Sequence, residues 1–156
     1  MAGRLAKEIH QTKPFASLEE ETALNLARTF EVLQQTAGEA LKPYHLTGTQ
    51  YNVMRILRGA GSVGVTCSQA SERMVNHDPD MTRLLDRLEA RKLVERERSR
   101  EDRRVVITRI TRKGLDLVNS LDEPMNAVLK QRFGRLGKEK LRELIDMLEG
   151  LRDAPE

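Results

Sequence analysis

Apolar residues recur every three or four positions along much of this chain, which is the spacing of one face of an α-helix. The first such stretch covers 17–41, starts with the capping pair Ser17 and Glu20, and stops before a proline. Its apolar positions are Leu26, Phe30, Leu33, Ala37 and Leu41. The pattern predicts one long amphipathic helix, while residues 1–16, which lack a strong period, are expected to form an arm or a short helix.

Two shorter helices are predicted next. Thr47 and Gln50 repeat the capping spacing ahead of a segment so rich in apolar residues that its helix should be largely buried. The apolar positions of this segment are Tyr51, Val53, Met54, Ile56 and Leu57. A pair of glycines is expected to end the helix, and Thr66 with Gln69 then begins a third, short helix.

A fourth helix is expected to begin at Asp78 and Pro79, because Asp can cap free amides and Pro at the first helical position has no amide to satisfy. Its apolar residues gather on one face, at Met81, Leu84, Leu85 and Leu88. On a helical wheel Arg83 points almost opposite to this face. A short helix, a tight turn and a helix with an apolar back and a polar, basic front predict a helix-turn-helix motif, whose second helix suits the major groove of DNA.

Two segments with β character follow the fourth helix. Residues 93–98 begin with Leu and Val and continue with charged side chains, and residues 105–110 are rich in β-branched side chains. The polar turn between them, 99–103, carries arginines. We therefore expect a β-hairpin whose tip is suited to contact phosphate groups or an adjacent minor groove.

The C-terminal part of the chain is again helical in its pattern. Thr111 is predicted to cap a long helix in which Pro124 should produce a kink. The apolar positions of that helix are Leu115, Val118, Leu121, Met125, Val128 and Leu129, and those of a last helix are Leu141, Leu144, Ile145, Leu148 and Leu151. Since a small central module cannot cover apolar faces at both ends of the chain, these faces predict the pairing of two copies.

Charge is distributed unevenly, although the formal net charge is only +3. Residues 91–113 hold ten basic and four acidic residues, so the remainder of the chain is net acidic. A local basic excess suits a polyanion, because each phosphate contact releases condensed counterions. A solvated hairpin that binds nothing would have the same composition, but the neighbouring helix-turn-helix pattern favours a nucleic acid.

Candidate catalytic residues are scarce. His10, His45 and His77 have no metal-binding spacing, no glycine-rich phosphate loop follows a strand, and no nucleophile motif is present. We therefore expect no enzyme, metal or cofactor. The single cysteine, Cys67, excludes an internal disulfide, and no stretch approaches the roughly 18 apolar residues of a membrane span. Without a signal-peptide pattern either, a cytoplasmic protein is expected.

The order of the predicted elements resembles the MarR family of transcriptional regulators over nearly the whole chain. The resemblance is most specific at 81–89 (MTRLLDRLE), 93–96 (LVER), 102–104 (DRR) and 110–114 (ITRKG). It implies a mainly α fold, a winged helix-turn-helix with long N- and C-terminal dimerisation helices and a two-stranded β wing. The implied boundaries are a single domain over 1–156, dimerisation helices over 17–41 and 112–156, and a DNA-binding lobe over 46–113.

The same resemblance implies a sequence-specific, DNA-binding transcriptional regulator. Such a protein would be a repressor that binds an inverted-repeat operator in double-stranded DNA as a homodimer and is released by a small anionic or aromatic effector. Arg104 would enter the minor groove while Asp102 orients it, and Thr82 and Arg83 would contact bases or phosphates. The full expected DNA-binding set is Pro79, Asp80, Thr82, Arg83, Arg87, Arg100, Asp102, Arg103 and Arg104.

The resemblance also implies a ligand pocket between the dimerisation helices and the lobe. Its expected residues, which would otherwise be core residues, are Phe30, Tyr44, His45, Tyr51 and Met54. Lys92 departs from the family, which usually has glycine there, and a left-handed backbone would be mildly strained for lysine. Two alternatives stay open: a protein-interaction adaptor with the same fold, and a redox sensor based on Cys67, although a small buried hydrophobe is the favoured role for this cysteine.

Overall fold

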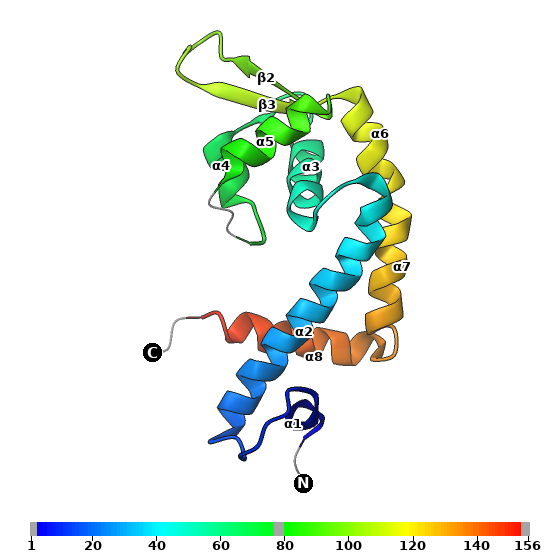
Figure 1. Cartoon of the computed structure of the whole chain (residues 1–156). Helices are drawn as coiled ribbons and strands as arrows, with labels where there is room; N and C mark the ends of the chain where they lie inside the picture. The colour runs from blue at the N-terminus through cyan, green and yellow to red at the C-terminus, as the bar shows by residue number, and fades with distance from the viewer. Residues whose placement is uncertain (1–2, 77–79, 154–156) are drawn as a thin grey trace.

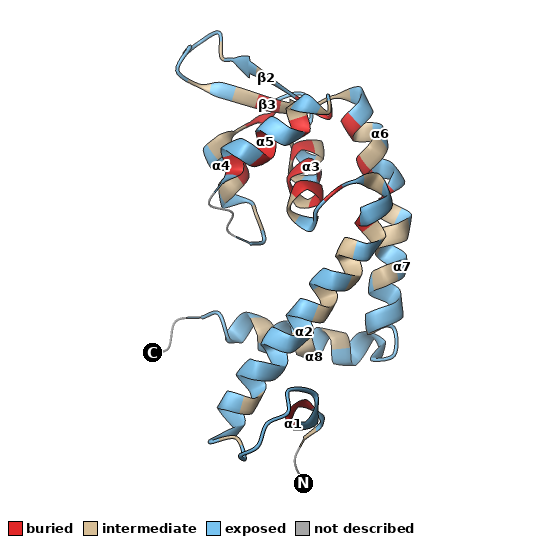
Figure 2. Cartoon of the chain, in the orientation of Figure 1, coloured by how far each residue is buried: buried red, intermediate tan, exposed pale blue. Residues whose placement is uncertain are grey.

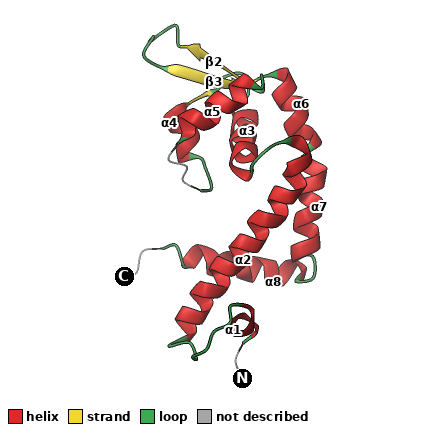
Figure 3. Cartoon of the chain, in the orientation of Figure 1, coloured by secondary structure: helices red, strands yellow, loops and turns green. Residues whose placement is uncertain are grey.

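The computed structural model describes residues 3–76 and 80–153 (Figure 1). The helices are α1 (Arg4–Glu8), α2 (Leu18–Leu41), the 3-10 turn η1 (Lys42–Tyr44), α3 (Gly48–Ala60), α4 (Cys67–Glu72), α5 (Met81–Ala90), α6 (Arg112–Ser120), α7 (Asp122–Phe133) and α8 (Gly137–Gly150). The strands are β1 (Val65–Thr66), β2 (Val94–Arg98) and β3 (Val106–Ile110). The predicted mainly α, winged-helix architecture is confirmed (Figure 3).

The elements form a lobe and a set of extended helices that leave it (Figure 1). We use "lobe" for α3, α4, α5 and the three strands, and "arms" for α2, α7 and α8. Helix α6 leads from the sheet to α7, which packs against α2, and α8 crosses α2 in the view of Figure 1. Both ends of the described chain lie away from the sheet, the N-terminal end at α1 and the C-terminal end after α8.

Most of the buried apolar side chains gather in the lobe and at its junction with the arms, and Leu5 and Ala6 of α1 are buried apart from them (Figure 2). Those of the lobe and the junction include Leu41, Val53, Met54, Leu57, Val65, Leu85, Leu88, Leu93, Val118 and Leu121. Within the described residues, α7 and α8 bury no side chain and α2 buries only Leu41. Phe30 is 49% exposed and Ile145 is 51% exposed, so one copy of the chain leaves apolar faces of the arms in solvent.

The helix starts follow the predicted capping residues. Thr47 and Gln50 form a complete capping box at α3, and Thr66 and Gln69 form another at α4. In each box the Thr hydroxyl accepts the Gln amide while the Gln side chain accepts the Thr amide, which satisfies two backbone donors that the helix leaves free. The long arm helix α2 also starts as predicted, at the cap Ser17.

The start of α5 differs from the prediction. The described helix begins at Met81, and its cap is Asp80, which accepts the backbone amide of Arg83 at 3.3 Å. Asp78 and Pro79, the expected start, lie outside the described residues. Two aspartates within three positions offer the same capping chemistry, so the sequence pattern alone does not distinguish them.

The end of α5 is a tight left-handed turn at Lys92, whose φ of 59° confirms the expectation for this position. The amide of Lys92 donates to the carbonyl of Glu89 at 2.8 Å, and the amide of Leu93 donates to the carbonyl of Leu88 at 3.0 Å. This pair of bonds is the Schellman arrangement, which normally employs glycine. It turns the chain from α5 directly into β2.

The sheet has the strand order β1-β3-β2 and is antiparallel throughout. Its β2–β3 hairpin, which we call the wing together with its 99–105 turn, matches the predicted hairpin, with Val94 opposite Ile110. The expected two-stranded arrangement is incomplete, because β1 adds a third strand. Two residues are too few to show an alternating pattern, and one of them, Thr66, is also the cap of α4.

The expected kinked helix is two helices. Helix α6 ends and α7 begins around Leu121, and Pro124 lies in the first turn of α7. Proline has no amide, and its ring clashes with the carbonyl four residues earlier, that of Ser120. The break therefore falls at the position where Pro124 prevents the helical hydrogen bond.

Candidate nucleic-acid interface

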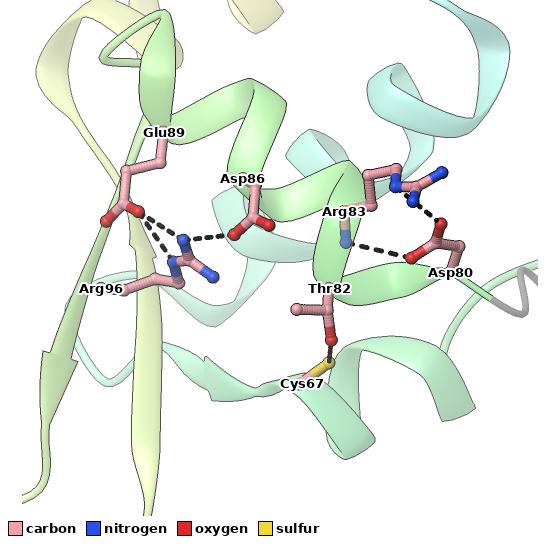
Figure 4. A network of polar contacts seen from close by, with 7 residues as sticks. All are labelled: Cys67, Asp80, Thr82, Arg83, Asp86, Glu89 and Arg96. Carbon is pink, nitrogen blue, oxygen red and sulfur yellow. Dashed lines mark hydrogen bonds and ion pairs between the residues drawn. The ribbon is translucent and has the colours of Figure 1, made fainter.

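Helix α5 turns its polar side to solvent. Thr82, Arg83 and Arg87 are exposed, whereas the four predicted apolar positions of the helix are buried. The Arg83 side chain is 71% exposed, and its Nε lies 3.2 Å from the Asp80 carboxylate (Figure 4). Asp80 thus caps the helix and holds the Arg83 side chain at the same time. These four members of the predicted DNA-binding set share one surface, and the fifth nearby member, Pro79, lies outside the described residues.

The helix-turn-helix consists of α4 and α5, which contact each other. Cys67, the first residue of α4, packs against the core but is only partly buried. Its Sγ lies 3.9 Å from the Oγ1 of Thr82 (Figure 4). Cys67 is therefore less buried than the sequence led us to expect, and its thiol contacts Thr82 on the polar side of α5.

The wing turn carries the other predicted DNA-binding residues, Arg100, Asp102, Arg103 and Arg104, all of which are exposed. The Asp102 carboxylate accepts the backbone amide of Arg104 at 2.9 Å. The amide of Val105 donates to the Asp102 carbonyl, also at 2.9 Å. Asp102 therefore fixes the backbone of Arg104 in this structure, rather than its guanidinium group.

The basic residues of 91–113 divide into two groups. The first group is tied to acidic side chains or carbonyl groups within the fold, and it consists of Arg91, Arg96, Arg98, Arg109, Arg112 and Lys113. The second group is exposed and consists of Arg100, Arg103 and Arg104 in the wing turn and of Lys92 just after α5. The charge count of the sequence therefore overstates the number of side chains placed to meet phosphate groups.

Arg96 joins the wing to α5, a contact that the sequence did not reveal. Its Nη2 lies 2.6 Å from the Asp86 carboxylate, and its Nε lies 2.9 Å from the Glu89 carboxylate (Figure 4). The hydrogen bond to Glu89 is the main cause that raises the pKa of Arg96 above its ordinary value. The signal that could have found this contact was the spacing of the two carboxylates, which lie three residues apart on one side of a predicted helix.

A cavity of about 340 Å³ lies between α2, α3 and residues 74–76. Of the five predicted pocket residues, Phe30 and Tyr51 line it. Arg55 also lines it, with its guanidinium carbon 5.9 Å from the centre of the Tyr51 ring. Burial is the main cause that raises the pKa of the Tyr51 phenol.

The structure places the other three predicted pocket residues elsewhere. Met54 is fully buried in the lobe, because it lies on the side of α3 that faces the core. The carbonyl groups of Tyr44 and His45 accept hydrogen bonds from Arg91, at 2.9 and 2.6 Å. These two residues therefore connect the end of α2 to the end of α5 instead of lining the cavity.

A second arginine connects the lobe to α7. Arg58, near the end of α3, lies 2.8 Å from the carboxylate of Asp122 and also donates to Asn119 at 2.9 Å. The hydrogen bond between Arg58 and Asp122 lowers the pKa of Asp122 and raises the pKa of Arg58. The lobe is thus attached to two of the three arms by an arginine: Arg91 holds the residues that follow α2, and Arg58 holds the start of α7.

The exposed polar surface of the lobe is the feature that defines the class of this protein. Over residues 3–76 and 80–153, no group of three or more metal-binding side chains comes together. None of the described helices has the length and apolar character needed to cross a bilayer. An exposed Arg/Thr helix face, set in a helix-turn-helix and flanked by an arginine-tipped hairpin, instead defines a winged helix-turn-helix DNA-binding protein.

Comparison with known proteins agrees with this class. A sequence profile of the MarR family matches residues 44–105. The solved structure of a MarR transcription factor from Planctomyces limnophilus is 37% identical and has a TM-score of 0.67, and the match covers 87% of this chain and 98% of that one. This chain therefore belongs to the MarR family of winged helix-turn-helix transcription regulators.

Two more distant proteins extend the comparison. The HTH-type transcriptional regulator MhqR of Bacillus subtilis (strain 168) is 24% identical over 124 residues, which cover 80% of this chain and 84% of MhqR. BpsR of Bordetella bronchiseptica, whose structure addresses the regulation of its DNA binding by 6-hydroxynicotinic acid, is 21% identical with a TM-score of 0.78. That match covers 92% of this chain and all of the BpsR chain, and it shows a shared fold.

Proposed function

We propose that this protein is a homodimeric repressor that acts in the cytoplasm by binding an inverted-repeat operator. The observation that carries the proposal is that one chain has two kinds of surface: an exposed basic face on the lobe and uncovered apolar faces on the arms. Two-fold pairing through the arms would place two α5 helices about one turn of DNA apart, roughly 34 Å. A dimer bound across such an operator blocks other proteins from the same DNA.

In this proposal α5 enters the major groove. Thr82, Arg83 and Arg87 face the base edges and phosphates, with Asp80 at the helix start and Pro79 just before it. Arginine can pair with the O6 and N7 atoms of guanine through two parallel hydrogen bonds, so Arg83 is the residue best suited to read a base. The polar, exposed surface of the helix supports this assignment.

The wing supplies the contacts outside the major groove. Arg104 enters the narrow minor groove, where shape and electrostatic potential are read more than base identity. Arg100 and Arg103 lie in the same exposed turn and meet phosphate groups, and Asp102 holds the backbone from which Arg104 projects. Their exposure and the local excess of positive charge support these roles.

Selection of bound fragments from random-sequence DNA, followed by salt titration, tests the proposal. We expect an inverted repeat, two chains per duplex, and an affinity that falls steeply between about 50 and about 200 mM salt. Bound DNA without internal symmetry would contradict the two-fold arrangement. A DNA affinity that does not change with salt concentration would contradict the phosphate contacts. A folded dimer that binds no DNA fragment would favour the adaptor alternative.

A specific observation favours a second element of the function, release by a small anionic aromatic effector. The cavity beside Phe30 and Tyr51 offers aromatic walls and the cation of Arg55. It lies between α2 and the lobe, so a bound ligand would contact both and could change the position of the lobe relative to the arm. Benzoate should raise the melting temperature and weaken operator binding, uncharged benzyl alcohol should do neither, and Arg55→Met should abolish both effects of benzoate. An unchanged benzoate response in Arg55→Met would exclude this cavity.

A further inference from the structure

Two parts of the DNA-binding surface are held together by one side chain at the base of the wing. Arg96 lies on β2, opposite the buried Thr108 of β3 and three residues before the wing turn. Its guanidinium group reaches across to the carboxylates of Asp86 and Glu89 on α5 (Figure 4). One planar group thus bridges the element proposed for the major groove and the element proposed for the minor groove.

The surroundings of Arg96 argue against a direct contact with DNA. Its side chain is only 25% exposed, compared with 71% for Arg83. Two carboxylates at hydrogen-bond distance already compensate its single charge. A phosphate group would have to displace these partners, and that would leave two uncompensated carboxylates beside the DNA.

We propose that Arg96 is a positioning residue, which fixes the angle of the wing relative to α5 so that the wing turn reaches the minor groove while α5 occupies the major groove. The inference rests on the wing contact proposed above for Arg104. Arginine suits this task because its rigid fork can hold two acceptors at once, whereas lysine presents a single rotating ammonium group.

A double-mutant cycle tests the coupling. Arg96→Met keeps the apolar stem of the side chain but removes the fork. We expect this change to weaken operator binding roughly tenfold in the parent protein, since it removes charge-assisted hydrogen bonds. In an Arg104→Ala background it should cost about threefold or less, because only the phosphate contacts of Arg100 and Arg103 then still depend on the angle of the wing. An equal loss in both backgrounds, or no loss in either, would overturn the inference.

The cycle also separates this inference from the proposed function. If Arg104→Ala alone leaves affinity unchanged, the wing contact itself is wrong. If Arg104→Ala weakens binding but Arg96→Met does not, the wing contact stands and the positioning role of Arg96 is wrong. The salt slope in the Arg104→Ala background distinguishes a direct phosphate contact by Arg96: adding Arg96→Met should leave that slope unchanged, whereas loss of a phosphate contact made by Arg96 itself would reduce it by about one.

Arg109→Met is the matched control. Arg109 lies on the same hairpin with a similarly covered side chain, but its partners are the Glu97 carboxylate on β2 and the Ser62 carbonyl in the turn before β1, and neither is on α5. Any effect of this change on operator affinity should be additive with Arg104→Ala. If its effect is as non-additive as that of Arg96→Met, loss of any anchoring arginine of the hairpin disturbs the wing, and the inference of a specific role for Arg96 is wrong.

A second test removes the two carboxylate partners of Arg96, and here electrostatics and positioning predict opposite changes in operator affinity. The double variant Asp86→Ala/Glu89→Ala makes the DNA-facing surface more positive by two charges, so electrostatics alone predicts tighter binding. The positioning role predicts weaker binding, because Arg96 loses both anchors on α5. Unchanged or tighter binding would overturn the inference. Circular dichroism and sedimentation should show that each variant remains folded with the oligomeric state of the parent.

Discussion

Arg83 and Arg104 differ in what holds them. The guanidinium group of Arg83 lies beside the Asp80 carboxylate, whereas Arg104 is held through its backbone amide by Asp102. DNA must therefore compete with a carboxylate for Arg83, but it finds the Arg104 side chain uncommitted to Asp102. An arginine that leaves its carboxylate only for a base with two good acceptors favours discrimination, while an uncommitted cation favours affinity.

Replacement of these two arginines should therefore have different effects. Arg83→Ala should relax base preference within the half-site by about 1 to 3 kcal/mol, the usual discrimination of a bidentate arginine. Arg104→Ala should weaken binding to all operators, lower the salt slope by about one, and change preference only for flanking A·T content. Competition binding to a panel of half-site variants at two salt concentrations measures both effects. Identical profiles for the two variants would contradict the division of roles.

At the scale of an element, the end of α5 carries a backbone cost. Lys92 occupies a left-handed conformation, and the Schellman bonds around it are complete. Lys92→Gly should therefore raise the free energy of unfolding by about 1 kcal/mol, since glycine adopts this conformation without strain. Urea unfolding measures the change, with Lys92→Ala as the control that removes the charge but keeps the strain. Equal stability of the two variants would show that the charge of lysine, not its backbone, matters here.

The sequence predicted those features of the elements that depend on near neighbours. The Thr47 and Thr66 capping boxes and the buried face of α5 need only residues three or four positions apart, and the structure confirms them. Contacts between distant segments were not visible in the pattern. The pairing of Thr66 with Ile107 in β1 and the bridge from Arg96 to α5 both depend on how the elements pack, for which a single sequence gives no periodic signal.

At the scale of the whole molecule, the junction between lobe and arms should respond to acid. The Arg58 hydrogen bond lowers the pKa of Asp122 below its ordinary value of 3.8. A lowered pKa means that the carboxylate stabilises the fold above that value and that this contribution is lost as the pH falls through the folded pKa. Asp122→Asn should therefore make the free energy of unfolding fall less steeply between pH 7 and about pH 3. Arg58→Met should give the same flattening in urea unfolding, and a parental slope in either variant would contradict the link.

The arms give a prediction about assembly. Ile145 is 51% exposed on α8, and pairing of two copies would cover it. The parent protein should sediment as a dimer at micromolar concentration, and Ile145→Glu should shift it toward monomer, because burial of an unpaired carboxylate is costly. Val63→Glu is the matched control, since Val63 is an exposed apolar residue of the 61–64 turn in the lobe and not of the arms. A dimer unaffected by Ile145→Glu would place the interface elsewhere.

The two arginine attachments between lobe and arms have a consequence for operator spacing. Insertion of one base pair between half-sites moves them about 3.4 Å apart and turns them by about a tenth of a helical turn. A lobe attached at Arg58 to α7 and at Arg91 to the residues that follow α2 cannot rotate independently of the arms to follow that displacement. The separation of the two α5 helices in the dimer should therefore be fixed. Such a dimer would reject an operator lengthened by a single base pair even when both half-sites are intact.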